Sequence, residues 1–183
     1  MRQYRIHRAK TSPALDGQWD SESWSESEIV ELRNARPEGS GHFPVTRARL
    51  LYGDEHLFGI FHVQDRYVHS VAKRCMEPVC KDSCVELFVK PKPESGYFNF
   101  EFNCGGKMLC YYITDPARKE EGFDNFQPFS EDDCSEVKIY HSMPEIVDPE
   151  MKAPVDWVIE FRIPFKLIEK YEVGNLRIRV EDF

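Results

Sequence analysis

Short runs of residues that favour β-strands, separated by turn residues, constrain this chain of 183 residues more than any other feature. The clearest run, YFNFEFN from Tyr97 to Asn103, places three phenylalanines on one face of a strand. Asn99, Glu101 and Asn103 fall on the other face, because the side chains of a strand alternate with a period of two. Repeated along the chain, this pattern predicts an all-β fold, either a sandwich or a barrel, and of the two we expect an antiparallel β-sandwich.

Turn signals arrange the runs into hairpins. Gly53-Asp54-Glu55 separates residues 47–52 from residues 57–63, and Gly105-Gly106 separates residues 97–103 from residues 107–113. Further strands are predicted at residues 84–89, 137–141, 156–163 and 176–180, and one short helix at residues 165–171. At this length one hydrophobic core suffices, so we expect a single domain over residues 1–183.

The balance of charge argues against several classes of partner. Lysines and arginines number 24 against 32 aspartates and glutamates, a net charge of −8, which disfavours binding to a phosphate backbone. No apolar run reaches the 18 or so residues that a membrane helix needs. The start Met1-Arg2-Gln3-Tyr4-Arg5 lacks an apolar signal segment. We therefore expect a cytoplasmic protein if Met1 is native and an extracytoplasmic one if it is not.

The cysteines do not follow the regular spacing of a disulfide scaffold. In a chain with its own core we expect mostly free, partly buried thiols. The six are Cys75, Cys80, Cys84, Cys104, Cys110 and Cys134. His69 and the first three suggest a zinc site, but C-x4-C-x3-C lacks the CxxC spacing of such sites. Buried thiols or a disulfide fit this spacing better.

A polar sheet face follows from the same alternation. Glu86 points away from its neighbours Val85 and Leu87, as Asn99 and Glu101 point away from the phenylalanines. Arg47 and Arg49 share one face of their own run. One interpretation is a solvated surface with cross-strand ion pairs. The other is a recognition surface for hydroxyl-rich ligands, on which the binding residues would be Glu86, Asn99, Glu101 and Arg49.

Four motifs, in order, resemble those of the family 9 carbohydrate-binding modules and their DOMON-like relatives. PALDGQWD from Pro13, followed by Trp24, is similar to the family's opening, and residues 46–65 are similar to its first hairpin. KDSCVELF from Lys81 is similar to its DSVE strand with one extra residue, and residues 157–164 are similar to its E-x-x-IP strand. The likeness runs from Tyr4 to about Val180 and is strongest to the bacterial family 9-like proteins.

The resemblance implies a jelly-roll or immunoglobulin-like sandwich that binds a sugar without catalysis, often at a polysaccharide end. In the family the sugar lies between two tryptophans, because its C–H faces stack on aromatic rings while its hydroxyls need directed donors and acceptors. Glu86 stands at the family's sugar-binding glutamate, and Asn99 or Glu101 near a polar residue that also reaches the sugar. Relatives also carry structural calcium, for which the loop acids are Asp16, Asp20, Asp65 and Asp82.

The chain departs from the family at both tryptophans. Val79 stands at the first, and no equivalent of the second occurs before Phe183, roughly where relatives continue with further strands. We therefore expect a module that lacks C-terminal strands. We also expect weak sugar binding, with dissociation constants near or above the millimolar range, about −4 kcal/mol.

Two other functions stay open beside sugar binding, and a third, catalysis, is not expected. A sandwich of this kind can serve as a protein-interaction or scaffold domain. Heme binding, known in some DOMON relatives, would use axial ligands such as His62, His69, Met76 or Met108, but no spacing singles out a pair. Glycosidase chemistry needs two carboxyls roughly 5 to 10 Å apart. Acids on one sheet also serve as acceptors for ligand hydroxyls, so we predict no enzyme activity.

Overall fold

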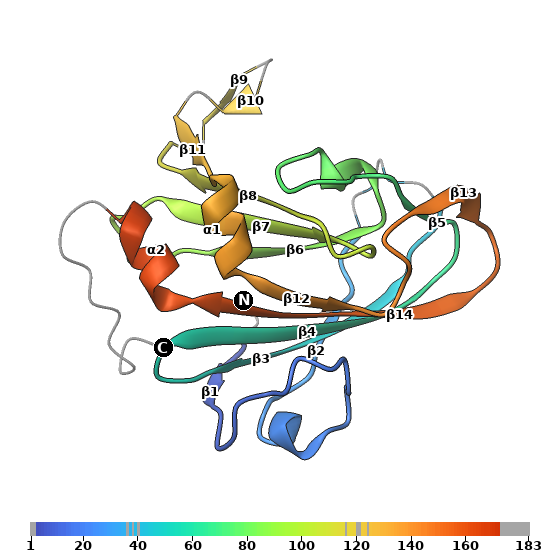
Figure 1. Cartoon of the computed structure of the whole chain (residues 1–183), viewed down its shortest axis with the longest axis horizontal. Coiled ribbons are helices and arrows are strands. Elements are labelled where there is room, and N and C mark those ends of the chain that lie inside the picture. Colours follow the sequence, from blue (N-terminus) through green and yellow to red (C-terminus); the bar gives the residue numbers. More distant parts are fainter. Residues whose placement is uncertain are drawn as a thin grey trace.

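The computed structural model describes residues 3–35, 37, 39, 41–115, 117–119, 122–123 and 125–172. Most of its strands belong to two sheets that pack face to face (Figure 1). This is the all-β sandwich that the alternation predicts, since the apolar face of each sheet is covered by the other. The strand predicted at residues 176–180 lies outside the described residues.

The larger sheet has six strands, in the order β1-β3-β4-β14-β12, with β2 also paired to β3. They are β1 (His7–Arg8), β2 (Val30–Leu32), β3 (Val45–Tyr52), β4 (His56–Asp65), β12 (Lys138–His141) and β14 (Val155–Pro164). β3 and β4 form the first predicted hairpin. β1 pairs with β3 in parallel, and the other pairs of this sheet are antiparallel.

The second sheet has four strands, in the order β11-β8-β7-β6. They are β6 (Cys84–Val89), β7 (Tyr97–Asn103), β8 (Met108–Ile113) and β11 (Phe126–Pro128). β7 and β8 form the second predicted hairpin, and its turn includes Gly106 at φ +81°, a conformation that favours glycine.

Smaller elements connect the sheets. They are the strand pairs β5 (Val68–Ser70) with β13 (Val147–Met151) and β9 (Arg118–Lys119) with β10 (Gly122–Phe123), the 3-10 helices η1 (Glu22–Trp24) and η2 (Val79–Lys81), and the α-helices α1 (Glu131–Glu136) and α2 (Phe165–Tyr171). α2 covers the residues of the predicted helix, whereas α1 was not predicted. Among the described residues, no helix is both long and apolar enough to cross a membrane.

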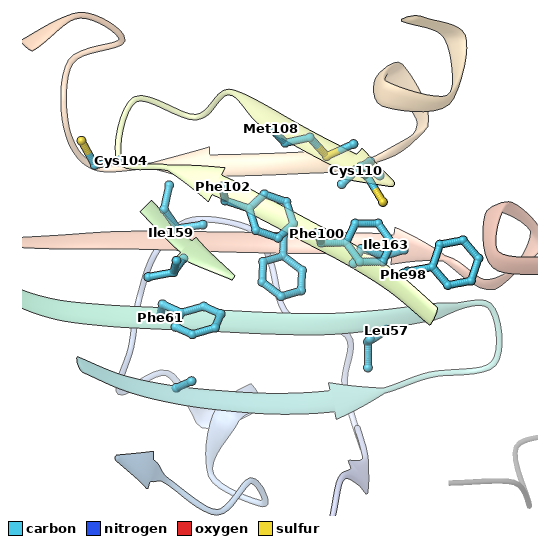
Figure 2. Close-up of a cluster of buried hydrophobic side chains, with 14 of the residues drawn as sticks. Leu57, Phe61, Phe98, Phe100, Phe102, Cys104, Met108, Cys110, Ile159 and Ile163 are labelled. Carbon is cyan, nitrogen blue, oxygen red and sulfur yellow. The ribbon is translucent and has the colours of Figure 1, made fainter. Parts of the chain in front are cut away.

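The core between the sheets is aromatic. Phe98, Phe100 and Phe102 of β7 are fully buried, and they project toward the larger sheet (Figure 2). Phe102 stacks on Phe161 of β14 with ring centroids 4.6 Å apart and planes 8° from parallel, so one contact joins the two sheets directly. Burial of a phenylalanine side chain contributes roughly 1.5–3 kcal/mol, which makes this row a main source of stability.

The outer face of the larger sheet is covered by the N-terminal segment (Figure 1). Trp24 of η1 is 1% exposed and packs in a second core with Leu51, Phe58 and Ile60. Trp24 is thus a packing anchor. Because this face is covered, the outer face of the four-stranded sheet is the better candidate for a ligand.

The cysteines divide into one pair and four free thiols. Cys75, in the loop between β5 and η2, forms a disulfide with Cys134 of α1. The free thiols are Cys80, Cys84, Cys104 and Cys110. The expectation of mostly free thiols is confirmed for these four, and the disulfide is the exception. It ties the loop that leads into β6 to the helix beside β12.

Candidate functional site

The site residues predicted from β6 and β7 lie on one face of one sheet. Glu86 of β6 pairs directly with Glu101 of β7, and Asn99 lies two residues along β7 on the same face. The phenylalanines of β7 occupy the opposite face, inside the core. The sheet therefore brings Glu86, Asn99 and Glu101 together, while their role as ligand-binding residues stays a prediction.

The polar side chains of β7 are less exposed than those of an ordinary outer face. Asn99 is 7% and Glu101 8% exposed, whereas Glu86 is exposed. The Asn99 amide donates from Nδ2 to Glu101 Oε1 over 2.8 Å. Because a carboxylate only accepts, this bond fixes the orientation of the amide and leaves Asn99 Oδ1 to point elsewhere.

The Asn99 Oδ1 atom is buried without a hydrogen-bond partner among the described residues. Leaving a buried acceptor unsatisfied costs about 1–3 kcal/mol, and buried polar atoms in folded proteins rarely stay in that state. The oxygen therefore keeps an unused capacity to accept a hydrogen bond. A hydroxyl is a suitable donor, since it can donate to Asn99 and accept from another group at once.

Aromatic side chains surround Asn99 on the same face. Phe88 of β6 pairs with Asn99 from one side, and Tyr111 of β8 pairs with it from the other. Phe88 lies 6.1 Å from Tyr97 between ring centroids, and Tyr111 lies 4.8 Å from Phe126. The face thus combines a hydrogen-bonding centre with aromatic rings, the two kinds of group that a sugar requires.

Tyr111 is held in a partly apolar setting. It packs against a small cluster formed by Ala72, Val79 and Leu109 beside η2. Burial raises the pKa of the Tyr111 hydroxyl, and the negative charge of Glu101 adds to the rise. Tyr111 therefore keeps its proton at neutral pH and can donate a hydrogen bond.

Val79 itself is fully buried in that cluster. Val79 aligns with the first of the two tryptophans that stack on the sugar in the resembled family. Because it packs in this cluster, it offers no ring on which a sugar could stack. The aromatic residues of β6 and β8 were not singled out from the sequence as flanking rings. Their positions opposite Asn99 follow from the strand register, which can be assigned once the hairpin of β7 and β8 is placed.

The expectation that Arg47 or Arg49 lies beside Glu86 is wrong. Both arginines belong to β3 of the larger sheet, on the side of the sandwich away from the four-stranded sheet. Arg49 donates from Nη1 to the Trp24 carbonyl over 2.8 Å, and its guanidinium lies 4.9 Å from the centroid of the Trp19 ring. Arg49 thus holds the N-terminal segment in place. Alternation assigns a side chain to a face of its strand but not to one of two sheets.

Candidate metal and heme ligands are not brought together. Among the described residues, no group of three or more His, Cys, Asp or Glu side chains is placed to hold a metal ion. Asp65 accepts from Trp157 Nε1, and Asp82 accepts from the backbone amides of Val71 and Ala72. These carboxylates, offered as calcium ligands, are committed to hydrogen bonds inside the protein. Met76 Sδ accepts from the Cys110 amide, and Met108 is buried in the core.

Comparison with known proteins gives one family and three structures. The family model for carbohydrate-binding family 9 matches residues 23–178. No curated protein sequence matches the chain.

The first of the similar structures is a Bacteroides uniformis protein whose carbohydrate binding is a provisional assignment. It is 24% identical, with a TM-score of 0.70, over 82% of this chain and 66% of its own. A family 9 module from Caldicellulosiruptor kristjanssonii in complex with glucose is 14% identical, with a TM-score of 0.52, over 87% and 68%. The module in complex with cellotriose is 16% identical, with a TM-score of 0.51, over 87% and 66%. The chain thus spans about two thirds of the length of each matched structure, and the likeness shows the fold.

Proposed function

The chain belongs to carbohydrate-binding family 9, and on that premise we propose that it is a non-catalytic module that binds a neutral sugar or polysaccharide end on the outer face of the four-stranded sheet. The observation that carries the proposal is the buried, unpartnered Asn99 Oδ1 between aromatic rings. Glu86, Asn99 and Glu101 would accept hydrogen bonds from sugar hydroxyls. Arg49 has no place in this site, because it lies on the other sheet.

A binding role accounts for these groups better than a catalytic one. Asn99 donates to one of the two carboxylates, and the pair Glu86 and Glu101 lies side by side on neighbouring strands rather than on the two sides of a cleft. A glycosidase places its two carboxyls on either side of the scissile bond. Two of the similar structures contain glucose and cellotriose, so gluco-configured sugars are the first ligands to test.

Titration calorimetry with glucose and cellotriose tests the proposal. We expect a dissociation constant near the millimolar range, equivalent to about −4 kcal/mol, because hydrogen bonds to sugar hydroxyls replace bonds to water and each yields only ~1 kcal/mol. Asn99→Ala removes the acceptor and should weaken binding about 2- to 10-fold. Asn34→Ala, at an exposed asparagine between β2 and β3, is the matched control and should bind as the unaltered chain does.

A thermal melt of each variant shows whether it folds. Absence of binding to any neutral mono- or oligosaccharide well above millimolar concentrations would contradict the proposal. It would favour the alternative of a sandwich that serves as a protein-interaction or scaffold domain. Equal binding by the Asn99→Ala variant would place the sugar elsewhere on the molecule.

A further inference from the structure

The larger sheet has an open edge along β2. Among the described residues, β3 is the one strand that pairs with β2, so the other side of β2 has no neighbouring strand. Four large apolar side chains that border β2 or lead into the paired end of β3 are between 41% and 51% exposed: Ile29, Leu32, Phe43 and Val45. An open edge with apolar side chains beside it is a template on which another strand can pair.

The backbone bonds of β3 show in which direction its residues point. At the turn into β4, the Gly53 amide donates to the His56 carbonyl, and in an antiparallel pair every second residue bonds to the partner strand in this way. The odd-numbered residues of β3 therefore bond to β4. The even-numbered residues point the other way, as the Leu50 amide does when it donates to the Tyr4 hydroxyl over 3.1 Å.

This alternation decides which groups of β2 face the open edge. Thr46 and Ala48 of β3 pair with Leu32 and Val30, so these two residues of β2 use their backbone groups on β3. The amide and the carbonyl of Glu31, which lies between them, point away from β3. The open edge therefore offers a donor and an acceptor at Glu31 to a further strand.

Charge selects how a second β2 strand can meet this edge. In an antiparallel register centred on Glu31, the two Glu31 carboxylates would face each other. In a register centred on Leu32, each Glu31 faces Arg33 of the second copy, and the two Leu32 side chains meet at the centre. Opposite charges directly across a strand pair stabilise it and like charges destabilise it, so the second register is favoured.

We propose that two copies of this chain associate through antiparallel β2 strands, about a two-fold axis at Leu32, so that their larger sheets form one continuous sheet. Each copy contributes the same surface to such an interface. Glu31 accepts from Nε of its own Arg33 over 3.1 Å, and in the dimer it also faces the Arg33 of the other copy. The inference goes beyond the proposed function, because a dimer presents two sugar sites to one polysaccharide.

Charge reversal tests the proposed register, with sedimentation equilibrium as the measurement. The unaltered chain should dimerise with a dissociation constant below about 1 mM, since the interface is small. Arg33→Glu leaves only carboxylates at these positions and Glu31→Arg only guanidiniums, so each variant alone should associate at least about 10-fold more weakly. Lys90→Glu, at an exposed residue after β6, is the matched control and should dimerise as the unaltered chain does.

A mixture of the two variants distinguishes lost pairing from a damaged fold. When an Arg33→Glu copy meets a Glu31→Arg copy, every cross-strand pair again joins opposite charges. The equimolar mixture should therefore dimerise at concentrations at which neither variant does so alone. A fold that the substitutions have damaged would not recover on mixing, and a thermal melt of each variant shows whether it folds.

Hydrogen exchange followed by nuclear magnetic resonance gives a second readout. The Glu31 amide points to the open edge, so its exchange should slow as the concentration of the chain rises and the dimer forms. A chain that stays monomeric up to about 1 mM overturns the inference. A dimer that both charge reversals leave intact, or folded variants that stay monomeric when mixed, overturns it as well. Sugar binding is measured separately by calorimetry, so these outcomes leave the proposed function standing.

Discussion

Gly17 shows how a single residue secures the N-terminal segment on the larger sheet. Its φ of +73° is a conformation that favours glycine, and a Cβ atom at this position would lie 2.0 Å from Cε1 of Tyr140. Its amide donates to Glu160 Oε2 over 2.7 Å. Burial raises the pKa of Glu160, whereas the amide bond from Gly17 lowers it. The Leu15-Asp16-Gly17 sequence of the N-terminal motif therefore has a structural role: it holds the N-terminal segment against the buried carboxylate of Glu160.

Gly17→Ala should destabilise the fold. The new methyl group meets both an unfavourable backbone conformation and the Tyr140 ring, so we expect a loss of roughly 1–3 kcal/mol in the free energy of unfolding. Gly41→Ala is the control, because a Cβ atom there has no neighbour within 4 Å. Urea denaturation of both variants measures the difference. Equal midpoints would contradict the close approach of Gly17 to Tyr140.

Single residues also show what the sequence could predict about the site. The faces of Glu86, Asn99 and Glu101 follow from the period of two within each strand and from the Gly105-Gly106 turn, which joins β7 to β8. The burial of Asn99 could not be predicted, because it depends on neighbours contributed by β6 and β8. Arg49 was misplaced for a related reason, since pairing between distant strands decides which sheet a residue joins.

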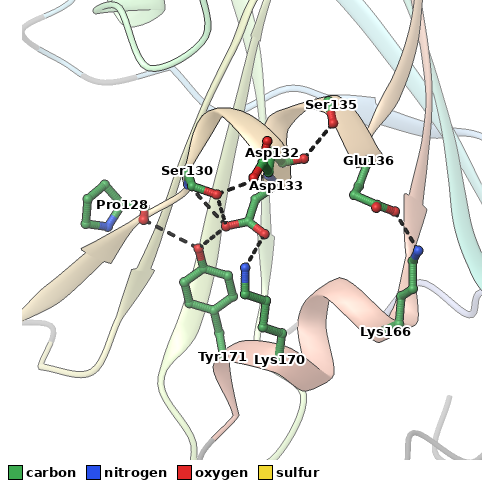
Figure 3. Close-up of polar contacts among 9 residues, drawn as sticks. All are labelled: Pro128, Ser130, Asp132, Asp133, Ser135, Glu136, Lys166, Lys170 and Tyr171. Carbon is green, nitrogen blue, oxygen red and sulfur yellow. Dashed lines mark hydrogen bonds and ion pairs between the residues drawn. The ribbon is translucent and has the colours of Figure 1, made fainter.

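At the scale of elements, Asp133 joins the two short α-helices (Figure 3). It completes a capping box with Ser130 at the start of α1, and it accepts from Lys170 Nζ and the Tyr171 hydroxyl of α2, each over 2.6 Å. Burial pushes the pKa of Asp133 upward, but the hydrogen bonds from Lys170, Tyr171 and Ser130 outweigh it and hold the pKa well below its usual range. The ionised carboxylate therefore stabilises the contact between the helices.

Because the pKa of Asp133 is lowered in the folded protein, we predict that acid weakens the contact between α1 and α2. A carboxyl whose pKa is lower in the folded state contributes stability above its unfolded pKa, about 3.9, and loses that contribution as the pH falls further. Asp133→Asn should lower stability at neutral pH by roughly 1–3 kcal/mol and should flatten the loss of stability below about pH 4.

Thermal melts between neutral pH and about pH 2 measure this effect. Asp132→Asn, at an exposed neighbour on the same helix, should leave the pH profile unchanged. A steep acid-induced loss of stability that persists in Asp133→Asn would show that other carboxyls control it.

The two helices also mark a limit of prediction at this scale. α2 follows Pro164 and carries buried apolar residues with helical spacing, so the sequence shows it. α1 has six residues, of which Asp133 is the one buried, and no apolar period reveals it. The pattern Ser130-Glu131-Asp132-Asp133 is a capping signal that could have located its start.

At the scale of the whole molecule, the two outer faces of the sandwich differ in what covers them. The N-terminal segment closes the face of the larger sheet, with Trp24 and Arg49 as its anchors. The face of the four-stranded sheet carries Glu86, the buried amide of Asn99 and the exposed ring of Phe88. We propose that this division assigns stability to one face and recognition to the other.

The position of the bound sugar is the most direct test of this account. In a nuclear magnetic resonance titration with cellotriose, the largest amide shift changes should fall on β6, β7 and β8, around Phe88, Asn99 and Tyr111. Residues of β3, including Arg47 and Arg49, should be unaffected, because they lie on the opposite face of the sandwich. Shift changes centred on the larger sheet, or none at concentrations well above the millimolar range, would contradict a sugar site on the four-stranded sheet.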